Sequence, residues 1–219
     1  MSTPFNGAVI GDAGLFQRLL PETHFVFDWN GTLIDDAART LTALNATRTG
    51  YGMTDMDDDA FRHAFHLPME SFLAEIGFPA GDVASALNDW QLGIEAREAP
   101  LAPGVAETLR ALYGRGRPAG VISAGFTAGV ERDAARLGIR EWLGFLHGSV
   151  TSKSAVLRDV LASTAPVVYV GDTEYDIREA IAAGAIPVGY SGGYRPAEAL
   201  LAAGAIAVIG DFRALLSRA

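Results

Sequence analysis

The sequence predicts an α/β protein: a Rossmann-like parallel sheet with helices on both faces, and a small all-helical domain inserted into it. Two observations predict this fold. The C-terminal half of the 219 residues alternates short β-branched runs with longer alanine-rich stretches. Residues 35–100 instead carry apolar residues at helical spacing and no convincing strand. We therefore assign residues 1–34 and 101–219 to the sheet domain and residues 35–100 to the helical insert.

The strands of the sheet are expected to be short runs that are apolar on both sides, as in a buried parallel sheet. These runs are residues 24–27, 121–122, 167–170, 186–188 and 206–209. Helices are expected around residues 127–137, 153–163, 174–183 and 196–203. Three of these helices stop at a glycine that adopts the left-handed conformation at little cost, namely Gly138, Gly184 and Gly204. Strands alternating with helices imply βαβ units with right-handed crossovers.

The helical insert follows the first predicted strand. Leu41 and Leu44, like Met69 and Phe72, have the spacing of residues on one helix face. Residues 100–104, Pro-Leu-Ala-Pro-Gly, mark the return to the sheet domain, because prolines and glycines interrupt regular structure.

Composition limits the possible functions. The chain has 17 Lys plus Arg against 26 Asp plus Glu, a net charge of −9, and no cysteine. Disulfides, thiolate metal sites and cysteine nucleophiles are therefore excluded. The acidic balance argues against nucleic acid or an anionic membrane as a partner, since the average field repels phosphate groups. No apolar stretch approaches the ~20 residues that span a bilayer.

Residues 1–20 lack the charged start and apolar core of a signal peptide. We therefore expect a cytoplasmic protein, monomeric or homodimeric.

Three side chains with useful chemistry stand where predicted strands end. Asp28, Ser123 and Asp172 each lie within two residues of the end of such a run. Ligands of an open parallel sheet bind outside the carboxyl ends of its strands. Each residue alone could be a helix N-cap, as we expect for Asp211, but three such sites together favour a functional cluster.

These residues also carry a resemblance to a known family. Residues 27–33, Phe-Asp-Trp-Asn-Gly-Thr-Leu, resemble motif one of the haloacid-dehalogenase-like hydrolases, a superfamily composed mostly of phosphatases. Ser123 resembles motif two, Lys153 motif three, and residues 171–176, Gly-Asp-Thr-Glu-Tyr-Asp, motif four. The insert resembles the small cap domain of that superfamily. The likeness covers nearly the whole chain from about Phe25 and is closest to phosphoglycolate-phosphatase-like members.

The resemblance implies a phosphatase that hydrolyses a small phosphorylated metabolite, a phosphomonoester, through an aspartyl-phosphate, with Mg²⁺ as cofactor. Asp28 would be the nucleophile. Asp28, the backbone carbonyl of Asn30 and Asp172 would ligate the metal, because magnesium prefers oxygen ligands. Asp176 would lie outside these ligands and orient metal-bound waters or Lys153.

The resemblance also implies which residues bind the phosphoryl group: Gly31, Thr32, Ser123, Ala124 and Lys153. Lys153 would supply positive charge as a catalytic residue. A lysine at a helix start could simply be solvated. However, a cation is disfavoured at the positive end of a helix dipole, which favours a functional lysine here.

Asn30 departs from the family pattern. Phosphatases of the superfamily usually have aspartate at this position, where it protonates the leaving alkoxide and then deprotonates the attacking water. An amide does neither, and the loss of such acid–base help costs ~10²–10⁴ in rate, or roughly 3–5 kcal/mol. Metal ligation would survive, because the ligand is a main-chain oxygen.

Three interpretations stay open. The protein is a phosphatase that is slower, or that uses substrates with good leaving groups, or that takes its acid from another residue. The residues available for that role are Asp35, Asp36, His63, His66, Glu70 and Glu75, although Asp35 and Asp36 are expected to cap the first helix of the insert. Alternatively, it is a phosphate-binding or regulatory module whose aspartyl-phosphate decays slowly. Carbon–halogen displacement is disfavoured, since Asp172 and Asp176 would then hold no metal.

The insert is expected to select the substrate by closing over the site. Its polar and aromatic candidates for this role are Arg39, Arg48, Arg62, His63, His66, Trp90 and Arg97. Several aromatic residues fit an apolar core of the insert instead, namely Phe61, Phe65, Phe72 and Trp90. Residues 57–59, Asp-Asp-Asp, are expected to start a helix.

Overall fold

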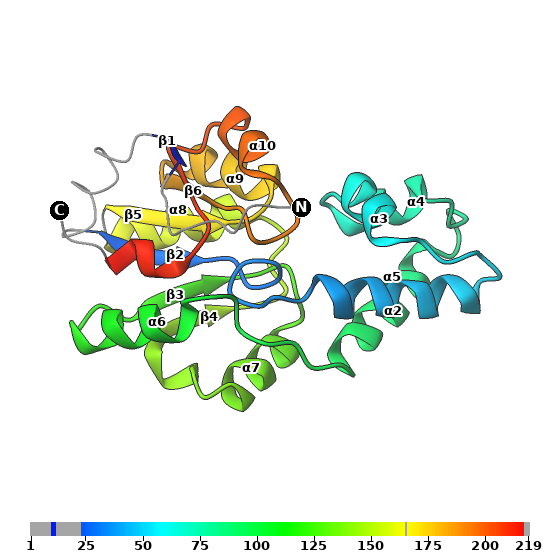
Figure 1. Ribbon diagram of the computed structural model, residues 1–219, viewed down its shortest axis with the longest axis horizontal. Coiled ribbons are helices and arrows are strands. Elements are labelled where there is room, and N and C mark those ends of the chain that lie inside the picture. Colours follow the sequence, from blue (N-terminus) through cyan, green and yellow to red (C-terminus); the bar gives the residue numbers. More distant parts are fainter. Residues whose placement is uncertain (1–9, 12–22, 165, 217–219) are drawn as a thin grey trace. The chain divides into compact units, whose positions relative to one another are not determined.

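The computed structural model describes residues 10–11, 23–164 and 166–216 (Figure 1). The chain divides into two compact units. Met1–Asp35 and Pro100–Ala219 form the first, which we call the core unit, and Asp36–Ala99 form the second, the cap unit.

The core unit is built on a sheet that has seven strands within the described residues, in the order β1-β7-β6-β5-β2-β3-β4. They are β1 (Ile10–Gly11), β2 (His24–Phe27), β3 (Ala119–Ile122), β4 (Leu143–His147), β5 (Val167–Gly171), β6 (Ile186–Tyr190) and β7 (Ala207–Ile209). Neighbouring strands run parallel, except that β1 is antiparallel to β7. The predicted α/β fold with a parallel sheet is therefore confirmed.

Two strands go beyond the sequence prediction. β1 lies in a region where no element is predicted. β4 lies at the edge of the sheet beside β3, and Leu143 is its one buried residue. The prediction selects runs that are apolar on both sides, so an edge strand with a largely uncovered surface escapes it. β3 also begins at Ala119, two residues earlier than predicted.

The helices of the core unit are α6 (Val105–Gly114), α7 (Thr127–Arg136), α8 (Lys153–Ser163), α9 (Glu174–Ala183) and α10 (Ala197–Ala202), with 3-10 helices η2 (Arg140–Trp142) and η3 (Phe212–Leu216). The predicted helices correspond to α7 through α10. Gly138, Gly184 and Gly204 have φ angles of 69°, 85° and 108°, so the left-handed conformation predicted at all three is confirmed.

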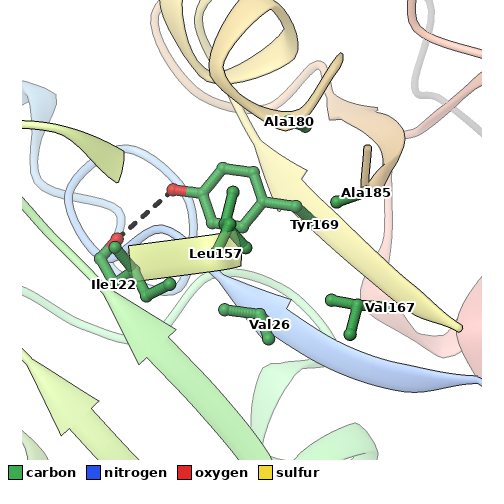
Figure 2. Close-up of a cluster of buried hydrophobic side chains, with 7 residues drawn as sticks. All are labelled: Val26, Ile122, Leu157, Val167, Tyr169, Ala180 and Ala185. Carbon is green, nitrogen blue, oxygen red and sulfur yellow. Dashed lines mark hydrogen bonds between the residues drawn. The ribbon is translucent and has the colours of Figure 1, made fainter. Parts of the chain in front are cut away.

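Helices cover both faces of the sheet. The side chains of β2 alternate between these faces, so each face presents apolar residues to the helices. Val26 packs with Leu157 of α8 and Ala180 of α9 on one face (Figure 2). Phe27 points to the other face, where its ring centroid lies 5.7 Å from that of Phe212 in η3. Helix α6 packs on η3 and so covers this second face.

The cap unit contains four helices within its described residues. They are α2 (Ala37–Gly50), α3 (Asp58–Ala64), α4 (Met69–Glu75) and α5 (Val83–Glu95). Helices α2 and α4 both pack on α5. The predicted aromatic core is confirmed: Phe61, Phe65, Phe72 and Trp90 are buried, and neighbouring ring centroids lie 5.3–6.3 Å apart.

Three of the candidates for substrate selection, among them Trp90, which was also a candidate for the core, hold the cap unit together instead. Arg39, Arg48 and Trp90 are buried, and each donates hydrogen bonds to backbone carbonyls of the same unit. An arginine or tryptophan used in this way is not available to a ligand. The sequence alone does not distinguish a buried arginine from an exposed one, which explains the error.

The acidic residues predicted to start helices of the cap unit behave differently from one another. Asp57 caps α3 as predicted, its carboxylate accepting from the Ala60 N–H at 2.7 Å. Asp36 occupies the N-cap position of α2, but its side chain makes no capping bond. The Asp36 carboxylate instead accepts from Thr40 Oγ1 at 3.2 Å and lies 3.7 Å from Arg39 Nε.

No helix in the described part of the chain has the length and apolarity needed to cross a membrane.

Candidate active site

The register of three neighbouring strands places the predicted site residues at one edge of the sheet. Strand β2 lies between β5 and β3, and Phe27 pairs with Val170 on one side and Val121 on the other. The residues that follow, Asp28, Asp172 and Ser123, therefore emerge side by side at the carboxyl ends of the strands.

Three carboxylates form a buried cluster at this edge. Asp28, Asp172 and Asp176 offer oxygen atoms that all lie within 4.8 Å of one another. Asp28 is 6% exposed, and Asp172 and Asp176 are fully buried. Buried carboxylates are rare unless they are paired or hold a cation, so this cluster needs positive charge.

Lys153 supplies part of that charge. It is the first residue of α8 and is 1% exposed, which excludes the solvated lysine that the sequence left open. The Nζ atom donates to Asp28 Oδ1 and to Asp176 Oδ1, each at 2.6 Å. One ammonium therefore bridges the first and the fourth sequence motif.

Asp176 is fixed by the start of α9. Its carboxylate accepts from the backbone N–H and hydroxyl of Thr173, while the Thr173 hydroxyl accepts from the Asp176 N–H in return, which is a capping box. The four-residue spacing of Asp172 and Asp176 would put them on one face of a helix, but α9 begins at Glu174, so Asp172 precedes the helix. The capping box, not helical periodicity, brings Asp176 to the cluster.

Asp172 is held by two donors. Thr32 Oγ1 donates to Asp172 Oδ1 at 2.9 Å, and the Tyr194 N–H donates to Asp172 Oδ2 at 2.7 Å. The hydroxyl of Thr32 is thus used by this carboxylate, and substrate binding by Thr32 stays a prediction. Space around Asp172 is tight, because a Cβ added at Gly31 or at Gly193 would lie 2.3 Å from Asp172 Oδ2.

The loop after β6, residues 191–195, is a part of the site that sequence reasoning missed. It contributes the Tyr194 N–H and the close approach of Gly193 to Asp172. The search for reactive side chains after strands overlooks such a loop, because its contribution comes from backbone groups. The signal in the sequence is Ser191-Gly192-Gly193 after the apolar run that ends at Tyr190.

The loop after β3 brings Ser123 and Asn30 together around Gly125. Ser123 is buried, and its Oγ accepts from the Gly125 N–H at 3.0 Å. A Cβ added at Gly125 would lie 2.9 Å from Asn30 Oδ1 and 3.3 Å from Ser123 Oγ. Asn30, from the loop after β2, therefore lies close to Ser123 and half-buried Ala124, from the loop after β3.

Burial and mutual repulsion control the charges of the cluster. Burial raises the pKa of Asp28 to about 7, with Lys153 opposing the rise and Asp176 adding to it. Burial, then the charges of Asp176 and Asp28, raise the pKa of Asp172 well above its usual range. Burial acts to lower the pKa of Lys153, but Asp176 and Asp28 outweigh burial and hold that pKa well above its usual value. The ammonium thus stays charged at neutral pH.

Comparison with known proteins gives the same picture. The sequence profile of the haloacid dehalogenase-like hydrolases matches residues 25–189. A protein named phosphoglycolate phosphatase from Synechococcus elongatus is 26% identical over 186 residues, covering 81% of this chain and 88% of that protein.

Solved structures share the fold. A haloacid dehalogenase-like family hydrolase from Streptococcus pneumoniae superposes with a TM-score of 0.79 at 22% identity, covering 89% of this chain and 96% of that chain. A structure titled as a predicted phosphatase from Clostridium acetobutylicum gives a TM-score of 0.76 at 20% identity, covering 85% and 93%. Because the family profile spans both strands and loops that build the carboxylate cluster, the chain belongs to the haloacid dehalogenase-like hydrolase family.

Proposed function

We propose that this protein is a Mg²⁺-dependent phosphatase that hydrolyses a small phosphomonoester through an aspartyl-phosphate on Asp28. The observation that carries the proposal is the buried cluster in which Lys153 joins Asp28 to Asp176 while Asp172 lies within 4.8 Å. The name of the cyanobacterial relative makes phosphoglycolate the first substrate to test.

The charge of the cluster supports a divalent cation. When ionised, the three carboxylates outweigh the single ammonium by two negative charges, all in a buried site. A hard cation with oxygen ligands balances this charge, and Mg²⁺ suits carboxylate and carbonyl oxygens. Asp28, Asp172 and the backbone carbonyl of Asn30 would hold the ion. When bound, Mg²⁺ supplies the positive charge that lets an anionic phosphate approach an anionic nucleophile.

The residues of the chain supply the nucleophile and the groups that bind the phosphoryl oxygens. A carboxylate oxygen of Asp28 attacks phosphorus, and the bond to the leaving oxygen breaks as the aspartyl-phosphate forms. Lys153 holds the Asp28 carboxylate in place and offsets negative charge that develops on the phosphoryl oxygens. Ser123 and the backbone groups of Gly31 and Ala124 bind those oxygens. The oxygen of a water molecule then bonds to phosphorus, the bond between phosphorus and the Asp28 oxygen breaks, and inorganic phosphate leaves. The proton of that water passes to the phosphate or to solvent, and the Asp28 carboxylate is regenerated.

Asn30 limits both steps. Its amide provides no proton for the leaving oxygen and no base for the attacking water, so we expect a rate lower by ~10²–10⁴ than with an aspartate. Substrates whose leaving group departs as a stable anion suffer less in the first step. A phosphate ester of a phenol is such a substrate and is the suitable first assay.

The test compares turnover of an aryl phosphate, with and without Mg²⁺, in the wild type, Asn30→Asp and Asp28→Asn. We expect Mg²⁺-dependent turnover that rises by at least about tenfold in Asn30→Asp and is abolished in Asp28→Asn. The alternative that Asn30 favours is a phosphate-binding or regulatory module without turnover. Equal background in all three proteins would support that module and reject the phosphatase.

A further inference from the structure

We propose that Tyr169 is a positioning residue, whose hydroxyl holds the Asp176 carboxylate and, through it, the Lys153 ammonium against Asp28. The inference rests on the proposed function for its catalytic consequence, but the positioning itself is testable without any activity. Its basis is the buried Tyr169 hydroxyl, which lies between two acceptors, Ile122 O and Asp176 Oδ1, at the carboxyl ends of the strands.

Apolar packing accounts for the buried ring of Tyr169 but not for its hydroxyl. Tyr169 is fully buried in β5, and its ring packs in an apolar cluster with Leu157, Ala180 and Ala185 (Figure 2). A phenylalanine would fill the same volume, and burying a hydroxyl costs free energy unless the hydroxyl is hydrogen-bonded. The hydroxyl is therefore accounted for by its hydrogen bonds and not by packing.

The hydroxyl joins two strands of the site. It lies 3.2 Å from the backbone carbonyl oxygen of Ile122, the contact drawn in Figure 2, and 3.2 Å from Asp176 Oδ1. Ile122 is the last residue of β3 and directly precedes Ser123. A single hydroxyl proton is thus shared between the end of the strand that carries Ser123 and the carboxylate that holds Lys153.

Asp176 Oδ1 is the acceptor that links Tyr169 to Lys153. It accepts both from Tyr169 and from Lys153 Nζ, while Oδ2 is bonded by Thr173. Gly171 packs against the Asp176 side chain, since a Cβ at Gly171 would lie 2.3 Å from Asp176 Cβ. With Thr173 fixing one oxygen and Tyr169 the other, Asp176 has one orientation, and Lys153 has one position.

Removal of the hydroxyl should loosen Lys153 without disturbing the fold. In Tyr169→Phe we expect kcat to fall about tenfold, the usual effect of losing a hydrogen bond to a charged group. KM and the Mg²⁺ concentration for half-maximal rate should change by less than about twofold, because the Tyr169 hydroxyl bonds Ile122 and Asp176 rather than a residue proposed to bind Mg²⁺ or the phosphoryl group. Tyr113→Phe, on a side chain 49% exposed on α6, is the matched control and should change none of these values.

A spectroscopic signature separates positioning from a merely structural role. Lys153 is the single lysine of the sequence, so ¹⁵N-lysine labelling gives one side-chain ammonium signal. We expect this signal to exchange with water about tenfold faster in Tyr169→Phe than in the wild type or Tyr113→Phe. The signal is readable even if the wild type has no turnover, so failure of the proposed function and failure of this inference are distinguishable.

The Asp176→Asn background completes the test. If Tyr169 acts through Asp176, Tyr169→Phe should cost less than about twofold in kcat once Asp176 is already changed. A full tenfold loss in that background, or an ammonium signal that Tyr169→Phe leaves unchanged, would overturn the inference.

Discussion

Affinity for Mg²⁺ should fall steeply as the pH drops below neutral, because protons and the metal compete for the same buried carboxylates. Burial raises the pKa of Asp28 from 3.8 to about 7 in the metal-free protein. A carboxyl whose pKa is raised on folding stabilises the folded state most at pH values below the unfolded pKa, and this contribution is lost as the pH rises through the folded pKa. The metal-free protein should therefore lose stability between about pH 4 and pH 7.

The magnitude follows from the protons displaced. A metal that requires ionised Asp28 binds about tenfold more weakly for each pH unit below the folded pKa, for one displaced proton. Asp28 is already about half protonated at pH 7, so between about pH 7 and pH 5.5 the dissociation constant for Mg²⁺ should rise about fifteenfold. The rise should be larger where Asp172, whose pKa is also raised, loses a second proton.

Isothermal titration calorimetry with MgCl₂ at these two pH values checks the prediction, and two buffers of different ionisation enthalpy give the number of protons released. Thermal unfolding supplies the second readout, since added Mg²⁺ should raise Tm more at the higher pH. Asp28→Asn should bind Mg²⁺ with a pH dependence smaller by about one proton. A dissociation constant that stays the same at both pH values, with no proton release, would refute the competition and with it the shared site.

Two further predictions concern stability. Gly31→Ala should destabilise the protein by about 1–3 kcal/mol in urea unfolding and should weaken Mg²⁺ binding. The reason is that φ is 72° at this position and the new methyl group would meet Asp172. Unchanged stability and affinity would contradict the tight packing described at Asp172. Phe72→Ala should cost about 3–5 kcal/mol, since the ring is fully buried among three other aromatic rings of the cap unit, while Leu92→Ala, at a side chain 54% exposed, should change stability by less than about 0.5 kcal/mol; similar losses in both variants would contradict the assignment of the aromatic core.

The central part of the fold was predictable because its strands are buried on both faces. β2 and β5 are nearly continuous apolar runs, and their parallel pairing puts Asp28 next to Asp172 once both are recognised as strand ends. β4 was not predictable by the same rule, since an edge strand keeps exposed residues. The two strands that were missed, β1 and β4, are thus the edge strands of the described sheet.

The candidate site was predictable where a polar side chain directly follows a buried strand, and it was missed at the loop after β6 and at Tyr169. Asp28, Asp172 and Lys153 stand out in the sequence, and the structure brings them together. The glycines at 192 and 193 mark the loop that carries the Tyr194 N–H, but they do not identify that donor, because every residue except proline carries a backbone N–H. Tyr169 was missed for another reason. An aromatic residue inside an apolar strand is expected to be core, and only the structure shows the partners of its hydroxyl.

The short strand β1 has a consequence for how the protein tolerates shortening. Ile10 and Gly11 pair with Val208 and Ala207 and so occupy the outer edge of β7. A chain that started after Gly11 would leave the N–H and C=O groups of that edge open to pairing with a second molecule. Self-association through β7, rather than loss of folding, is therefore the expected fate of an N-terminal truncation.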